Sequence, residues 1–228
     1  GGAVTEGQRK FMGTFWNTYA FYVLYANIDE FDPTKYTLDY DKLPVMDKWL
    51  LSKLNTVVKA VDEHLENYRI VRRSRERFWA KGMEQDKINA YMTLYTSLVT
   101  LAKVSAPYIP FMTEDIYRNL VLSVDKTAPE SIHLCLYPTY NEAYIDKELE
   151  KNMEELLEIV VLGRSCRNAA NIKNRQPIGN MYVKADFTYA DEAGNTVKGL
   201  PTFFTKIIEE ELNVKKITFT DDVRDFTS

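Results

Sequence analysis

The sequence predicts a mainly α-helical fold, a helical bundle followed by a long helix and a small α/β unit. Through the first two-thirds of the 228 residues, apolar side chains recur at three- and four-residue steps, the spacing of one helix face. After Pro177, short runs rich in β-forming residues replace that pattern. We therefore expect two domains, residues 1–144 as the bundle and residues 145–228 as the long helix with a junction unit.

Breaks at prolines, glycines and polar clusters divide the predicted bundle into helices. The expected helices are 8–28, one that begins after Pro44, 71–79, 86–105 and 113–122, with a short extended piece at 132–137. In the first of them Phe11, Phe15, Tyr19 and Tyr22 form an aromatic stripe, which we expect to lie in the core. Asp29, Glu30 and Asp32 follow it and are interpreted as turn and capping residues.

The second domain begins with a long helix predicted at 146–170, acidic in its first half and basic in its second. That order of charges suits the helix dipole. A strand at 181–185, a helix at 201–212 and a strand at 215–220 complete the predicted α/β unit.

Several classes of function find no support in the sequence. Cys135 and Cys166 are far apart and lack neighbours at metal-ligand spacing, so we expect two reduced thiols in a cytoplasmic protein and no metal site. No apolar run approaches the roughly 20 residues of a membrane span. No glycine-rich phosphate loop and no nucleophile with a partner base is present, so no residue is assigned a catalytic role.

Two basic stretches are the candidates for binding. In 69–81, six cations stand against one acid, and on a helix Arg72, Arg75 and Trp79 share one face while Arg73 and Arg77 share the next. Guanidinium groups beside an indole can hold phosphates and stack on unpaired bases. The alternative is a solvated face whose arginines pair with carboxylates. Phe78 is expected in the core, Trp79 is the candidate residue most readily buried, and Arg73 or Arg77 the one most readily held in a salt bridge.

The second stretch, 163–178, carries four cations, no acid, three asparagines and a glutamine. Amide side chains can read base edges, and the small residues between them allow close approach of a backbone. The alternative is a helix end capped by cations and followed by a loop. The candidate residues in this stretch are Arg164, Arg167, Asn171, Lys173 and Arg175.

At these stretches the chain resembles the isoleucyl-tRNA synthetase family. The similar segments, in order, are QRKF through LYAN (8–27), VRRSRERFW (71–79), APYIPFMTE (106–114) and NIKNRQPI (171–178). The resemblance covers nearly the whole chain, and the last segment is the most specific. It implies an all-helical anticodon-binding domain followed by a junction region that also contacts tRNA.

The resemblance also implies partners and cofactors. The partners are the anticodon stem-loop of isoleucine tRNA and an upstream catalytic domain of the same polypeptide, in a cytoplasmic, monomeric protein without membrane contact. ATP and Mg²⁺ belong to that catalytic domain, which would lie upstream of Gly1, so this piece is expected to hold no cofactor and to be inactive alone. The two basic stretches are then expected to line two walls of an anticodon cleft. The alternatives are another class I synthetase, such as the valyl one, and a helical protein-interaction scaffold.

The chain departs from the family pattern in one place. Between Ile70 and Val71 the family carries an additional helix and an Asn-Trp-Tyr-type lead-in, whereas here the two residues are adjacent. Either the chain has a real deletion or its sequence omits a segment, and we favour the second. A distance between the Ile70 and Val71 α-carbons far above 3.8 Å would support it.

Overall fold

The computed structural model describes residues 2–59 and 75–224, and the chain separates into two compact units. Unit 1 spans residues 1–146 and unit 2 spans residues 147–228. Helices dominate the described residues, so the predicted mainly α-helical class is confirmed. The junction between Ile70 and Val71 lies outside the described residues.

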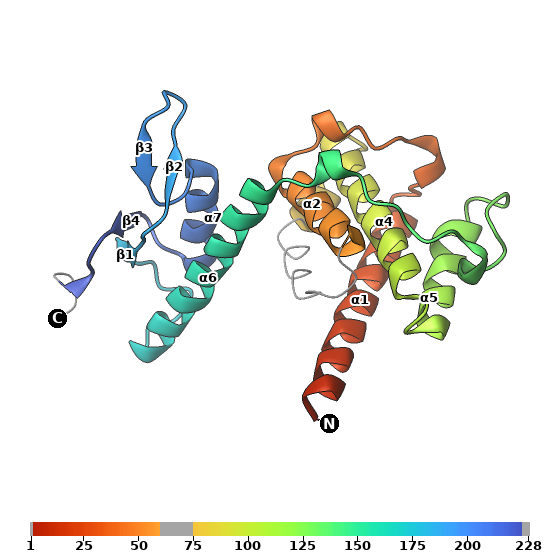
Figure 1. Cartoon of the computed structure of the whole chain (residues 1–228), viewed down its shortest axis with the longest axis horizontal. Coiled ribbons are helices and arrows are strands. Elements are labelled where there is room, and N and C mark those ends of the chain that lie inside the picture. The colour runs from red at the N-terminus through yellow and green to blue at the C-terminus, as the bar shows by residue number, and fades with distance from the viewer. Residues whose placement is uncertain (1, 60–74, 225–228) are drawn as a thin grey trace. The chain divides into compact units, whose positions relative to one another are not determined.

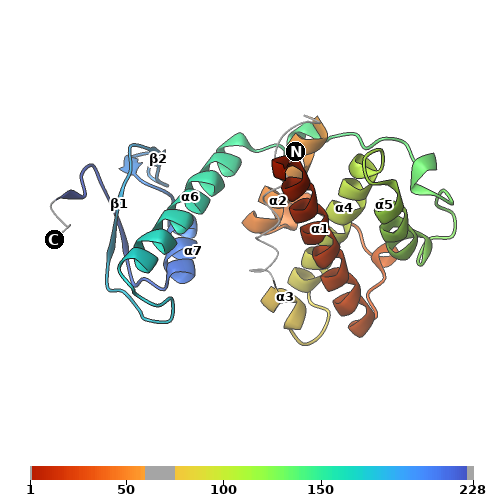
Figure 2. The ribbon, with the colours of Figure 1, turned by 90° about the horizontal axis from the view of Figure 1, so that it is seen from below.

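Unit 1 is a helical bundle in which α4 packs against α1, α2, α3 and α5 (Figures 1 and 2). Its elements are α1 (Gly2–Ile28), η1 (Pro33–Lys35), η2 (Tyr40–Lys42), α2 (Val45–Lys59), α3 (Arg75–Trp79), α4 (Gln85–Ser105), α5 (Pro110–Tyr117), η4 (Arg118–Leu122), η5 (Ile132–Leu134) and η6 (Glu142–Tyr144). The predicted helices are therefore present, with the third described only from Arg75 onward.

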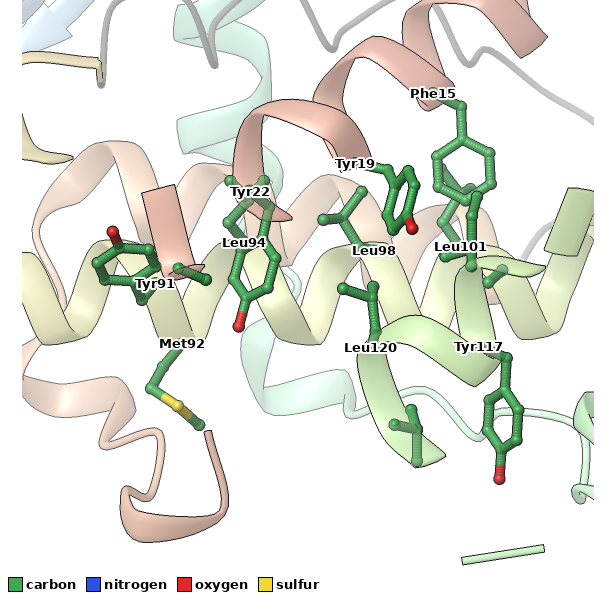
Figure 3. Close-up of a cluster of buried hydrophobic side chains, with 14 of the residues drawn as sticks. Phe15, Tyr19, Tyr22, Tyr91, Met92, Leu94, Leu98, Leu101, Tyr117 and Leu120 are labelled. Carbon is green, nitrogen blue, oxygen red and sulfur yellow. The ribbon is translucent and has the colours of Figure 1, made fainter. Parts of the chain in front are cut away.

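The core of unit 1 lies between α1, α4 and the helical segment α5–η4 (Figure 3). Phe15, Tyr19 and Tyr22 of α1 are buried there, as the aromatic stripe predicts. They meet residues such as Tyr91 and Leu98 of α4. Burying one such side chain contributes about 2–3 kcal/mol before the entropy of ordering is subtracted, so this stripe fixes α1 against the bundle.

The ends of the elements are set by local capping. Asp32 accepts a hydrogen bond from the Thr34 amide at 3.0 Å and starts η1, which confirms its predicted capping role. Helix α5 starts at Pro110, earlier than predicted, because the fixed φ of proline suits the first turn of a helix. The extended piece predicted at 132–137 is wrong. Its first residues form the turn η5, whose start is capped by the Ser131 hydroxyl.

Unit 2 consists of two helices and two small sheets (Figure 1). Its elements are α6 (Lys147–Ala169), β1 (Met181–Lys184), β2 (Thr188–Ala190), β3 (Thr196–Lys198), α7 (Thr202–Leu212) and β4 (Ile217–Thr220). Strands β1 and β4 pair in parallel, with Met181 opposite Ile217, and α7 lies between them in the chain. Helix α6 packs closely on α7, where the α-carbon of Gly163 faces the Leu212 side chain.

The β2–β3 hairpin of unit 2 was not predicted. Its turn is closed by the Asp191 carboxylate, which accepts hydrogen bonds from the amides of Ala193 (3.0 Å) and Asn195 (2.7 Å), and Gly194 supplies a positive φ of 82°. The hairpin could therefore have been predicted from Asp191 and Gly194, which are the residues that its turn requires.

Among the described residues, no helix combines the length and the apolar content that crossing a membrane requires.

Candidate nucleic-acid interface

Helix α3 is the part of the first basic stretch that the structure describes. Arg72 and Arg73 lie outside the described residues. Phe78 is buried, with edge-to-face contacts to Phe21 of α1 and Tyr91 of α4 at centroid distances of 5.1 and 4.8 Å. The predicted core position of Phe78 is confirmed, and it orients the rest of α3.

Arg77 is held by carboxylates and is withdrawn from the set of candidate RNA-binding residues. Its guanidinium donates to both carboxylate oxygens of Asp47 in α2 (2.6 and 2.9 Å) and to both of Asp86 in α4 (2.8 and 2.9 Å). Arg77 and Asp47 are both largely buried. Burial raises the pKa of Asp47 above its ordinary value, with Arg77 opposing the rise. Burial would likewise lower the pKa of Arg77, but the two carboxylates raise it. Arg77 therefore joins three helices, and the predicted salt bridge is confirmed for this residue.

Arg75 and Trp79 lie one helical turn apart and are both exposed. The Trp79 side chain is 57% exposed, so the expectation that it would be buried is wrong. Its indole N–H donates to the Tyr25 hydroxyl of α1 at 2.7 Å, which fixes the ring at the surface. The Arg75 guanidinium lies 5.4 Å from the centre of the Phe21 ring, also on α1. An oriented indole beside an exposed cation is suited to stacking on a base and contacting a phosphate.

In the second basic stretch, Arg167 is a buried structural residue, and this corrects its predicted role. Only 1% of it is exposed. Its guanidinium donates to the carbonyl oxygens of Leu212 (3.0 Å), Gln176 (2.5 Å) and Lys173. These bonds join the end of α6 to the last residue of α7 and to the loop after α6. An arginine so enclosed cannot reach a phosphate.

Arg164, one turn earlier on α6, is paired but not buried. Its guanidinium donates to Glu211 of α7 at 2.7 Å, and its side chain stays about half exposed. An exposed pair of this kind is weak. Arg164 can therefore be drawn to a phosphate more readily than Arg77 or Arg167.

Asn171 ends α6 in the left-handed conformation, with a φ of 56°. The backbone N–H of Ile172 donates to the Arg167 carbonyl at 2.8 Å, and the backbone N–H of Asn171 donates to the Asn168 carbonyl at 3.1 Å. These are the two hydrogen bonds of a Schellman motif. Asparagine tolerates this conformation better than most residues. The left-handed backbone conformation thus explains why an asparagine suits this position. The side-chain amide of Asn171 remains exposed.

A second asparagine, Asn213, holds the backbone of the loop between α6 and β1. The sequence did not single it out as a candidate. Asn213 ends α7 with a φ of 51°, and its side-chain amide donates to the Asn174 carbonyl at 3.1 Å. The Ile178 amide bonds the Asn213 carbonyl at 3.0 Å. Asn213 could have been recognised in the sequence, because it directly follows the helix predicted at 201–212.

Four consecutive side chains of this loop point to solvent. Lys173, Asn174, Arg175 and Gln176 are all exposed, although their backbone is tied to α6 and α7. Within the described residues, neither Lys173 nor Arg175 has a carboxylate at ion-pair distance. The loop therefore presents two cations and two amides on a fixed backbone, a combination that can bind phosphates and base edges without a large ordering cost.

The two basic stretches belong to different units of the chain. Across the described residues, no group of three His, Cys, Asp or Glu side chains is placed to hold a metal ion. Cys135 and Cys166 are both free thiols.

Comparison with known proteins identifies the class. Residues 70–182 match the family described as the anticodon-binding domain of tRNA ligase. The relatives include the isoleucine–tRNA ligases of Clostridium novyi (47% identical over 99% of this chain), Dehalococcoides mccartyi (40% over 94%) and Porphyromonas gingivalis (36% over 96%). The chain spans about a fifth of the length of each, 22%, 22% and 20%.

The fold and these matches define an anticodon-binding module of a tRNA ligase. More particularly, the chain belongs to the isoleucyl-tRNA synthetase family. The alignments with three clostridial relatives run over 241 to 244 positions, more than the 228 residues of this chain. Those relatives therefore carry residues that this chain lacks, and the lengths alone do not place them in the sequence.

Proposed function

We propose that this chain binds the anticodon stem-loop of isoleucine tRNA as one part of an isoleucine–tRNA ligase. Other parts of that polypeptide would join isoleucine to the tRNA, and ATP and Mg²⁺ would act in its catalytic domain. The complete protein would work in the cytoplasm as a monomer. The observation that carries the proposal is the fixed loop with outward Lys173, Asn174, Arg175 and Gln176.

Each group has a separate task in the proposal. Lys173 and Arg175 contact phosphates, which supplies much of the affinity of a nucleic-acid complex. Asn171, Asn174 and Gln176 offer donors and acceptors to base edges.

Trp79 and Arg75 form the second contact region, together with Arg72 and Arg73. Unstacking an anticodon base costs a few kcal/mol, and a base stacked on an aromatic ring returns about 1–3 kcal/mol. Arg164 takes part only if its pair with Glu211 opens.

The proposal is tested by equilibrium binding of this chain to isoleucine tRNA and to the same tRNA with a substituted anticodon. We expect tighter binding to the native anticodon. The double variant K173A/R175A should weaken it by about tenfold or more, because two phosphate contacts are lost. K206A removes one exposed lysine of α7 on the same unit and should change the affinity less than twofold.

Equal affinity for the two tRNAs would contradict anticodon reading by the isolated chain. Equal effects of K173A/R175A and K206A would contradict the loop as the contact surface. Binding that ignores RNA sequence and salt would favour the protein-interaction scaffold instead.

A further inference from the structure

Three consecutive glutamates, Glu209, Glu210 and Glu211, stand in the last turn of α7, which carries no basic residue. Carboxylates at the C-terminal end of a helix oppose the helix dipole and weaken the helix. The stability of α7 therefore does not explain why glutamates stand at this end, and their partners must supply the reason.

The first and the third of these glutamates have different partners. The Glu209 carboxylate accepts a hydrogen bond from the Ile217 amide at 3.1 Å, at the start of β4. The Glu211 carboxylate instead accepts a hydrogen bond from the guanidinium of Arg164 on α6 at 2.7 Å. Glu209 thus has a structural role, whereas Glu211 meets a cation of the second basic stretch.

The position of Glu211 is fixed by the packing of α6 on α7, which lie side by side (Figure 1). The two helices approach so closely that a side chain at Gly163 would collide with Leu212. Arg164 and Glu211 are the next residues on the two helices. One turn further along α6, the Arg167 guanidinium bonds the Leu212 carbonyl at 3.0 Å. Backbone packing therefore holds the Glu211 carboxylate opposite Arg164.

Arg164 consequently differs from the two cations of the loop after α6. Lys173 and Arg175 are exposed and have no carboxylate at ion-pair distance within the described residues, whereas Arg164 has Glu211. A phosphate that approaches Arg164 also meets the negative charge of Glu211, and the two opposite charges largely cancel each other's field. The basic surface of unit 2 therefore stops short of Arg164.

Masking a cation in this way affects specificity more than stability. A protein discriminates between ligands by weakening its binding to the wrong one as well as by strengthening its binding to the right one. Every RNA offers phosphates, so each unmasked cation adds affinity for all sequences alike. A carboxylate that neutralises a cation beside the contact loop removes such affinity and leaves the contacts of the loop intact.

We infer that Glu211 is a specificity-determining residue, which neutralises Arg164 and confines RNA phosphates to the loop that carries Lys173 and Arg175. The inference rests on the proposed function, since it takes that loop as the contact surface. It assigns Arg164 no phosphate contact in the complex with isoleucine tRNA.

The test measures the binding of a short oligouridylate and of isoleucine tRNA to Glu211→Gln, which keeps the size of the side chain and removes its charge. The affinity for oligouridylate should rise by about two- to fivefold, the strength of an exposed ion pair. Its slope of log K against log salt should steepen by about 0.7, the value of one added phosphate contact on a single strand. The affinity for isoleucine tRNA should rise by less than about twofold, because the anticodon directs its phosphates to the loop.

Two controls separate the ion pair from a general change of charge. Glu192→Gln removes the same charge from an exposed site in the β2–β3 turn of unit 2 and should change neither affinity by more than about 1.5-fold. In a chain that carries Arg164→Ala, the change Glu211→Gln should leave oligouridylate binding unaltered, because no masked cation remains to be released.

An unchanged oligouridylate affinity in Glu211→Gln would overturn the inference. Equal gains for oligouridylate and isoleucine tRNA, or a gain that persists without Arg164, would overturn it as well. Equal affinity for native and substituted anticodons, with the gain for oligouridylate present and dependent on Arg164, would contradict anticodon reading and still support the masking of Arg164 by Glu211.

Discussion

Arg167 and Arg175 belong to the same basic stretch but have opposite roles. Arg167 is buried and bonded to three backbone carbonyls, whereas Arg175 is exposed on the loop that those bonds hold in place. A buried carbonyl that loses its partner costs about 1–3 kcal/mol. The guanidinium of Arg167 therefore holds the backbone of the loop and is not itself accessible to a ligand.

At the residue scale we predict that Arg167→Met destabilises unit 2 by about 2–4 kcal/mol, because three carbonyls lose their donor. Arg175→Met should stay within about 0.5 kcal/mol, as surface substitutions do. Hydrogen exchange of the β1 and β4 amides measures the change, since all three tryptophans lie in unit 1 and report on that unit alone. Equal exchange in the two variants would contradict the structural role of Arg167.

At the scale of elements, Glu114 joins α5 to the turn η5. It accepts hydrogen bonds from Arg118 (2.8 Å), the Ser131 hydroxyl (2.8 Å) and the Ile132 amide (3.0 Å). Partial burial alone would raise the pKa of Glu114, but these bonds outweigh it and hold the pKa below the ordinary value of 4.5.

A carboxyl with a lowered pKa stabilises the folded chain above pH 4.5, and this contribution is lost as the pH falls through its folded pKa. We predict that Glu114→Gln lowers the free energy of unfolding of unit 1 by about 1–2 kcal/mol at pH 7. The difference from the unchanged chain should shrink steadily below pH 4.5. Urea unfolding followed by tryptophan fluorescence provides both values, and a difference independent of pH would show that the charge of Glu114 is not involved.

The long elements could be predicted from the sequence, since α1, α4 and α6 each repeat the helical spacing over several turns. The short elements could not be predicted in this way, because a single capping side chain determines where each one forms. Ser131 starts η5, and Asp191 closes the β2–β3 turn. The basic stretches could also be located. The division of their arginines into anchors and exposed cations could not, because the acceptor of Arg167 on Leu212 is remote in the sequence.

At the scale of the whole molecule, a formal net charge of −4 limits how the chain can hold RNA. Half of the described candidate cations are already paired or buried, namely Arg77, Arg164 and Arg167. Affinity must then come from a few local contacts rather than from the average field of the protein. The dependence of binding on salt counts these contacts directly.

Arg75, Lys173 and Arg175 are the exposed candidate cations without a described carboxylate partner, and Arg72 and Arg73 lie outside the described residues. Each phosphate contact contributes about 0.7–0.9 to the slope of log K against log salt. We predict a slope between about −2 and −4 for isoleucine tRNA, reduced by about one in Arg175→Ala and unchanged in Lys206→Ala. A slope near −7 would require the buried arginines to be released, and the assignment of Arg77 and Arg167 as anchors would then be wrong.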